Sequence, residues 1–176
     1  MAVINGTNAA NNLIGTADSD QINGLGGNDT INALTRPPAG GFDVVDGGSG
    51  TDTLVVDASS ETLSVQLVYG GSPSFSVFSD SGNFRIDAYN IEVIKFTGGS
   101  GDDIINSGER GGTVNGNGGI DHWLANLGAL FTNVTFNLGT TTSISAAGLT
   151  ALRGEGAVRG PASGTRARRC ALRRLG

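Results

Sequence analysis

Residues 47–55 read GGSGTDTLV, and residues 98–106 read GGSGDDIIN. Both stretches follow one nine-residue frame, Gly-Gly-x-Gly-x-Asp-x-U-x, in which U is a large apolar residue. Glycine permits tight turns, and the apolar residue after the aspartate suits a short strand with one buried face. The frame therefore predicts a turn followed by a strand, repeated every nine residues.

The frame extends outward from these two stretches. It fits eight segments: 6–14, 15–23, 24–32, 38–46, 47–55, 98–106, 107–115 and 116–124. The U position holds Leu13, Ile22, Ile31, Val45, Leu54, Ile105, Val114 and Trp123. The aspartate position holds Asp20, Asp29, Asp43, Asp52, Asp103 and Asp121, with Asn11 in the first segment and Gly112 in the seventh. A fixed period of this kind predicts a solenoid in which each repeat packs on its neighbours.

The pattern changes between residues 57 and 97. Apolar residues there alternate with polar ones, and the breaks GGSPS (70–74) and SDSGN (79–83) separate the runs, which predicts antiparallel strands. Alternation returns at 132–145, and no segment shows a helical period. We therefore expect an all-β chain: a parallel β-roll, or β-solenoid, of nonapeptide repeats interrupted by an antiparallel β insert.

These patterns divide the chain into five parts. We expect a first β-roll block at 1–56, the antiparallel insert at 57–97, a second β-roll block at 98–124, a terminal β segment at 125–152 and a basic, disordered tail at 153–176. The composition of the tail favours a disordered end. A basic arm for a membrane or nucleic acid and a segment that is not native to the protein are the alternatives.

Charge separates the body from the tail. Residues 1–152 hold 15 of the 16 acidic residues and four basic ones, a net charge of −11, whereas residues 153–176 carry +6. An acidic body favours cations over nucleic acid as its partner. With 30 glycines and 38% hydrophobic residues in regular positions, an ordered solenoid is favoured over disorder.

The chain lacks the usual export and cross-linking signals. Cys170 is the single cysteine, so no intramolecular disulfide can form. No transmembrane segment is evident, and residues 1–20 lack the charged and apolar regions of an N-terminal signal peptide. We expect that the chain either stays inside the cell or carries an export signal that is not N-terminal.

Glycine turns and aspartates together suit calcium. Calcium takes six to eight oxygen ligands in irregular geometry, which two turns stacked at the ~4.8 Å strand spacing can supply from carbonyls and carboxylates. If successive repeats lie on opposite sides of a flattened coil, every second repeat is a neighbour. The expected stacks are Asn11 with Asp29 and Asp52, Asp20 with Asp43, and Asp103 with Asp121. About two to four ions would fit, and folding should depend on them.

The frame resembles the RTX, or haemolysin-type, calcium-binding repeats of secreted bacterial proteins. The resemblance covers residues 6–55 and 98–124, and it implies a parallel β-roll with Ca²⁺ held by carboxylates and turn carbonyls. It implies the carboxylate ligands Asp20, Asp29, Asp43, Asp52, Asp103 and Asp121, with Asn11 in the first turn. The implied carbonyl positions are Gly24, Gly27, Gly41, Gly47, Gly48, Gly50, Gly98, Gly99, Gly101, Gly116 and Gly119. Gly112 departs from the frame and is expected to leave its side of the stack weak.

The resemblance also implies a location and a role. Members of this family leave the cell through type I secretion machinery that reads a C-terminal signal, although the Arg-rich tail of this chain does not resemble such signals. The leading hypothesis is a non-enzymatic, extracellular calcium-binding protein that acts as a structural, surface or adhesion element, with a cell-surface or self-association partner. The alternative is the calcium-binding, secretion-assisting region of a larger secreted hydrolase or cytolysin, which an upstream reading frame encoding a catalytic domain would favour.

Rival sites fit the sequence less well. An EF-hand loop counted from Asp18 fails because Asn23 stands where that loop requires glycine. His122 is the single histidine and has no cysteine nearby, so zinc sites and His-dependent triads are disfavoured and a solvent-facing strand residue is the better interpretation. The remaining acids are expected on the solvated surface: Asp57, Glu61, Asp80, Asp87 and Glu92.

Overall fold

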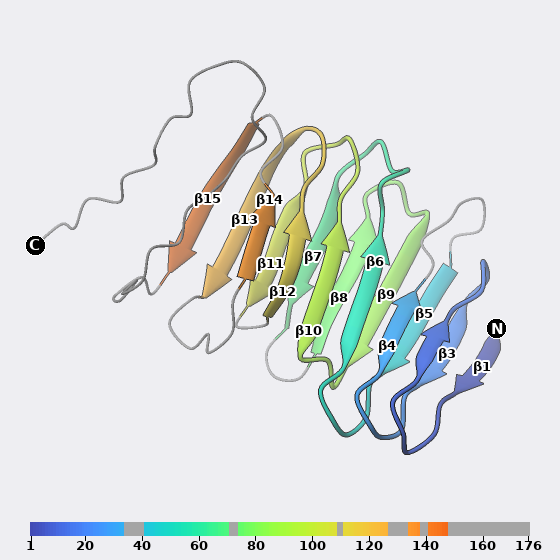
Figure 1. The fold of residues 1–176 in the computed structure, drawn as a ribbon. Coiled ribbons are helices and arrows are strands. Elements are labelled where there is room, and N and C mark those ends of the chain that lie inside the picture. The colour runs from blue at the N-terminus through green and yellow to red at the C-terminus, as the bar shows by residue number, and fades with distance from the viewer. Residues whose placement is uncertain (34–40, 71–73, 109–110, 127–133, 138–140, 148–176) are drawn as a thin grey trace, which may run out of the picture.

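Through the repeats, the chain alternates between two β-sheets that face each other across an apolar core (Figure 1). The computed structural model describes residues 1–33, 41–70, 74–108, 111–126, 134–137 and 141–147. Every regular element in these ranges is a strand. None of the described residues lies in a helix that is long and apolar enough to cross a membrane.

The described strands form one sheet of nine and one of six. The nine-strand sheet runs β1 (Ala2–Asn5), β3 (Asp20–Asn23), β5 (Gly41–Asp46), β9 (Phe84–Tyr89), β8 (Ser74–Ser79), β7 (Val65–Tyr69), β11 (Ile104–Gly108), β13 (Ile120–Asn126) and β15 (Thr141–Ala147). The six-strand sheet runs β14 (Val134–Asn137), β12 (Gly111–Asn115), β10 (Val93–Thr97), β6 (Thr53–Asp57), β4 (Thr30–Ala33) and β2 (Asn12–Ile14).

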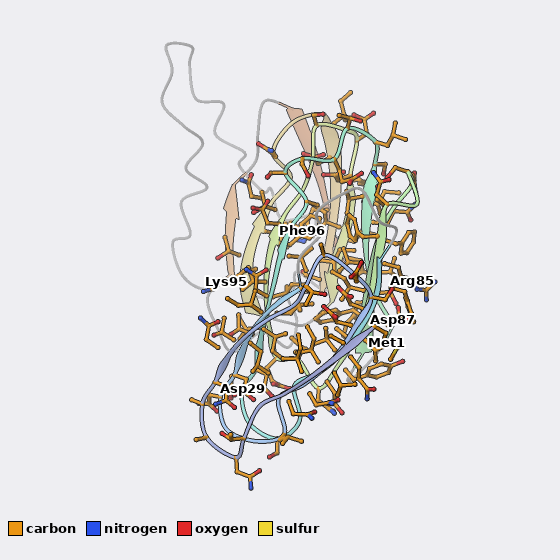
Figure 2. All side chains as sticks on the ribbon, turned by 90° about the vertical axis from the view of Figure 1, so that its right-hand side faces the viewer. Met1, Asp29, Arg85, Asp87, Lys95 and Phe96 are labelled. Atoms are coloured by element: carbon orange, nitrogen blue, oxygen red, sulfur yellow. The ribbon has the colours of Figure 1, made fainter. Side chains whose placement is uncertain are left out.

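The repeats pair in parallel, every second repeat beside the next, which confirms the predicted β-roll. Ile31 of β4, for example, pairs with Leu13 of β2 and with Leu54 of β6. All eight apolar residues at the U position are buried. Figure 2 shows Phe96 between the two sheets, while the adjacent Lys95 lies on the outside. Each short strand thus buries alternate side chains, and burial of a large aliphatic side chain stabilises a fold by roughly 1.5–3 kcal/mol.

The antiparallel insert is present, and it widens one sheet. Strand β8 runs antiparallel to both β7 and β9, whereas β9 is parallel to β5 and β7 is parallel to β11. Strand β10, which falls in the predicted insert range, pairs in parallel with β6 and β12. Alternation of apolar residues is common to both pairing modes, so the pattern of β10 did not distinguish them. The meander therefore lies within the nine-strand sheet, and the six-strand sheet passes it without interruption.

Glu61 anchors this meander, and its prediction as a surface residue is wrong. It is buried, and its carboxylate accepts hydrogen bonds from Ser79 Oγ at 2.8 Å, Ser81 Oγ at 2.9 Å and Asn83 Nδ2 at 3.2 Å. The donors lie at the end of β8 and in the turn that follows it. A buried carboxylate with several donors is stable where an unpaired one would be costly, so these bonds hold the turn against the segment that precedes β7.

In the second repeat block, the segment 107–115, which is the seventh to fit the frame, is shifted in strand register. Val114 of β12 pairs with Phe96, and Gly112 therefore stands opposite Ile94 inside the sheet. A side chain at Gly112 would meet the Ile94 backbone, and its φ of 138° also favours glycine. Strands β14 and β15 continue the two sheets in parallel. The predicted tail at 153–176 lies outside the described residues.

Candidate metal centre

The six aspartates of the frame lie where turns meet strands. Asp20 begins β3 and Asp121 is the second residue of β13, while Asp29, Asp52 and Asp103 directly precede β4, β6 and β11. Asp43 lies within β5. All six side chains are at most 3% exposed. Figure 2 shows Asp29 toward the end of the roll where the turns lie. Carboxylates are rarely buried to this extent unless their oxygens have partners.

One oxygen of each carboxylate joins neighbouring coils. Asp29 Oδ1 accepts a hydrogen bond from the Asn11 N–H at 2.7 Å, and Asp52 Oδ1 accepts one from the Asp29 N–H at 2.7 Å. The same bond joins Asp20 N–H to Asp43 Oδ1 at 2.8 Å and Asp103 N–H to Asp121 Oδ1 at 3.0 Å. These bonds confirm the predicted stacking of every second repeat.

The second oxygen is left without a partner in three of the six aspartates. Oδ2 of Asp29, Asp52 and Asp121 is buried and has no hydrogen-bond partner among the described residues. An orphaned buried carboxylate oxygen is costly, because it has lost its water and gained no donor. The fold therefore presents three buried carboxylate oxygens whose desolvation a bound cation or a proton would offset.

Glycine carbonyls lie beside the Oδ2 atoms of Asp29 and Asp103. A side chain on Gly24 would fill a space that Asp29 Oδ2 and the Gly47 carbonyl oxygen bound. A side chain on Gly98 would meet Asp103 Oδ2 and the Gly116 carbonyl oxygen in the same manner. Gly24 and Gly98 thus each keep open a cradle formed by the aspartate of the same repeat and by the glycine carbonyl of the next coil.

The other predicted glycines shape the turns in different ways. Gly27, Gly48, Gly50 and Gly119 have positive φ, between 88° and 142°. Side chains on Gly99 and Gly101 would collide with the backbone at Glu61 and Leu63. Gly41 is the first residue of β5. These glycines therefore allow close stacking of coils, whereas Gly41 stands in a strand.

The first two turns differ from the others because threonine stands at the second position of the frame. The Thr16 N–H and Oγ1 both donate to Asp20 Oδ2, at 2.5 and 2.9 Å, and the Thr7 N–H donates to Asn11 Oδ1 at 2.6 Å. Threonine thus supplies from within the turn the donors that Asp29, Asp52 and Asp121 lack. The substitution of Thr7 and Thr16 in the frame is the sequence signal that could have revealed this difference.

The residues present fit calcium better than a metal that needs a side-chain cluster. The described residues contain no group of three or more His, Cys, Asp or Glu side chains placed to hold a metal ion. A cation in these cradles must take most of its oxygens from backbone carbonyls, and mixed carbonyl and carboxylate ligands are typical of calcium. Bound there, calcium would supply the positive charge that the orphaned oxygens of Asp29, Asp52 and Asp121 require.

Burial raises the pKa of four of these carboxyls. Burial raises the pKa of Asp43 and of Asp103 from 3.8 to about 6. Backbone N–H donors oppose the shift, and repulsion from Asp20 and from Asp121 adds to it. Burial also raises the pKa of Asp52 and of Asp121. In the metal-free fold these carboxyls therefore take up protons at a higher pH than a solvent-exposed aspartate does.

This shift predicts an unusual pH dependence for the metal-free chain. A raised pKa gives stability that is complete below pH 3.8 and is lost as the pH rises through about 6, at roughly 3 kcal/mol for each of Asp43 and Asp103. Circular dichroism of metal-free protein should show more β-structure at mildly acidic than at neutral pH. With saturating calcium the trend should reverse, because protons compete with the metal. A metal-free chain that is most ordered at neutral pH would contradict this prediction.

The comparisons agree with this geometry. The family model for the RTX calcium-binding nonapeptide repeat matches four copies in the chain, over residues 5–34, 39–60 and 95–109. The matched ranges include the first five aspartates of the frame, and Asp121 lies beyond them. A search of curated proteins returned no relative that matches the chain.

Proposed function

Since the chain contains RTX calcium-binding nonapeptide repeats, we propose that it is an extracellular β-roll protein that folds when it meets calcium. The observation that carries this proposal is the set of buried, unpartnered oxygens of Asp29, Asp52 and Asp121 at the turns. Their burial makes the metal-free fold costly, so ligand binding and folding are linked. The folded roll then acts as a structural, surface or adhesion element.

The expected affinity supports an extracellular site of action. Calcium sites of extracellular modules commonly have a Kd of about 10⁻⁴–10⁻³ M, which is too weak to fill in a cytosol that keeps calcium low. A chain that stays unfolded inside the cell and folds outside is suited to export through type I machinery. The acidic body of the chain, at −11 over residues 1–152, is consistent with a cation as its principal ligand.

The role that we propose is not catalytic. His122, the single histidine of the sequence, is exposed on β13, next to the buried Asp121 and Trp123. The buried acids bond to backbone N–H groups of the adjacent coil, as Asp43 does to Asp20. This arrangement supports a structural use of these carboxylates.

A titration followed by far-UV circular dichroism tests the proposed function. We expect β-structure to appear with a midpoint between about 10⁻⁴ and 10⁻³ M calcium. Magnesium should be much less effective, because it demands near-ideal octahedral geometry and gives up its water reluctantly. A spectrum that is complete without calcium, or a midpoint in the range of cytosolic calcium, would overturn the proposal.

A further inference from the structure

The ladder of carboxylates continues beyond the last repeat of the first block. Strand β10 pairs with β6 so that Val93 stands opposite Thr53, which places Glu92 opposite Asp52. Glu92 Oε2 accepts a hydrogen bond from the Asp52 N–H at 2.8 Å. Asp52 Oδ1 accepts the equivalent bond from Asp29. Glu92 therefore holds the ladder position of a repeat aspartate, although it lies in no repeat.

Asn90 takes the position of a repeat glycine in the same coil. The space that a side chain on Gly47 would fill is bounded by Asp52 Oδ2 and the Asn90 carbonyl oxygen. Beside Gly24, the Asp29 Oδ2 and the Gly47 carbonyl bound the corresponding space. The cradle at Gly47 is thus bounded, like the cradle at Gly24, by one carboxylate oxygen and one carbonyl oxygen. The carbonyl oxygen at Gly47 comes from Asn90, which lies outside the repeat frame.

The backbone at Asn90 is held in place. Asn90 has a φ of 51°, a left-handed conformation that asparagine adopts more readily than most residues. Its Nδ2 donates to Asp46 Oδ1 at 2.8 Å, and the Gly47 N–H donates to the Tyr89 carbonyl at 3.0 Å. The Asn90 carbonyl is therefore fixed beside the turn that contains Asp52.

Side-chain length compensates for a shorter turn. In the repeats, five positions separate the first glycine from the aspartate, as between Gly47 and Asp52, whereas Asn90 and Glu92 are two positions apart. Glutamate is longer than aspartate by one methylene, which allows its carboxylate to reach the Asp52 N–H from this contracted turn. The frame could not reveal this pair, because neither residue stands at the repeat spacing.

An independent observation indicates that a ligand is required here. Asp52 is fully buried, and its Oδ2 faces this cradle without a hydrogen-bond partner among the described residues. Two carboxylates on adjacent coils, one of them buried, need a cation between them to offset their desolvation and repulsion. Carboxylate and carbonyl oxygens are the ligands of calcium.

We propose that Asp52, Glu92 and the Asn90 carbonyl form a calcium site that closes the first repeat block and joins it to strand β10. This inference rests on the proposed calcium-dependent folding. The site links coils that are 40 residues apart in sequence, as the bond between Asp52 and Glu92 shows. The meander β7–β9 lies between these coils in the chain. Strand β10, which follows the meander, would therefore be fixed against β6 only when calcium is bound.

The variant Glu92→Gln tests this site in the full chain, with calcium as the probe. Glutamine keeps an acceptor for the Asp52 N–H and removes the charge. Isothermal titration should show the loss of one calcium equivalent, or a weakening of one site by about tenfold or more, with the other sites retained. Asp80→Asn is the control, because Asp80 is an exposed acid in the turn that follows β8, and it should bind calcium as the parent chain does.

The outcomes separate this inference from the proposed function. If the parent chain binds calcium and Glu92→Gln binds the same number of ions with the same affinities, the Glu92 site is overturned and the proposed function stands. If the parent chain binds no calcium, the proposed function itself fails. Should Glu92→Gln not fold, crystals of the parent chain grown in calcium decide: an anomalous calcium peak should lie beside Asp52 Oδ2 within coordination distance of the Glu92 carboxylate and the Asn90 carbonyl, and ordered residues there with no such peak would overturn the site.

Discussion

Withdrawal of calcium at neutral pH is expected to remove most of the β-sheet signal of this chain. The buried Oδ2 atoms of Asp29, Asp52 and Asp121 would then face no positive charge. Adjacent carboxylates would repel by about 1–4 kcal/mol per pair, depending on the local dielectric. Thirty glycines add a large entropic cost of ordering. Small domains have only about 5–15 kcal/mol of net stability, so these terms together are enough to unfold the roll.

Calorimetry and circular dichroism measure this effect. In excess chelator, the cooperative thermal transition should disappear or move far downward, and added calcium should restore it. Magnesium at the same concentration is the control for ionic strength and divalent charge. Because one apolar core runs through both repeat blocks and the meander, we expect a single main transition in calcium. An unchanged transition in chelator would show that the fold does not need the metal.

Replacement of Asp29 by alanine should cause the largest loss among single aspartate variants. Asp29 lies in the middle of its stack: its Oδ1 accepts from Asn11, and its N–H donates to Asp52. Alanine removes that acceptor and also the Oδ2 that faces the cradle at Gly24. We expect a loss of about 2–4 kcal/mol in unfolding free energy in calcium and an affinity at least about tenfold weaker at that site.

The matched control for this variant is Asp80→Ala. Asp80 is exposed, and its Oδ1 accepts one hydrogen bond from Gln66 Nε2 at 2.9 Å. Surface substitutions of this kind change stability by about 0.5 kcal/mol or less. Denaturant unfolding in calcium, together with a calcium titration, compares the two. Similar losses in both variants would contradict the assignment of Asp29 to a metal-binding turn.

The repeat frame predicted the positions of the residues that form the roll. A nine-residue period places each U side chain on the inner face of a strand, and Ile31 and Leu54 are fully buried in adjacent strands as expected. It also predicted which coils would stack, because a flattened coil brings every second repeat together. The hydrogen bond between Asp20 and Asp43 follows from this stacking, even though the two residues are 23 positions apart and not 18, because extra residues interrupt the period between them.

The repeat frame could not reveal functional residues that lie outside its own positions. Glu61 and Glu92 occupy no repeated position, and their roles depend on which coil the meander brings beside them. Thr16 satisfies Asp20 within its own turn, an effect of one hydroxyl and one N–H that a regular pattern does not encode. Such contacts depend on tertiary register, whereas the period of a sequence reports only which face of a strand is buried.

Anomalous diffraction from crystals grown in millimolar calcium tests the central claim most directly. We expect calcium peaks beside the Oδ2 atoms of Asp29, Asp52 and Asp121, with the Gly47 carbonyl within coordination distance of the first and the Asn90 carbonyl within coordination distance of the second. Ordered turns at these three aspartates with no anomalous peak beside any of them would contradict this claim.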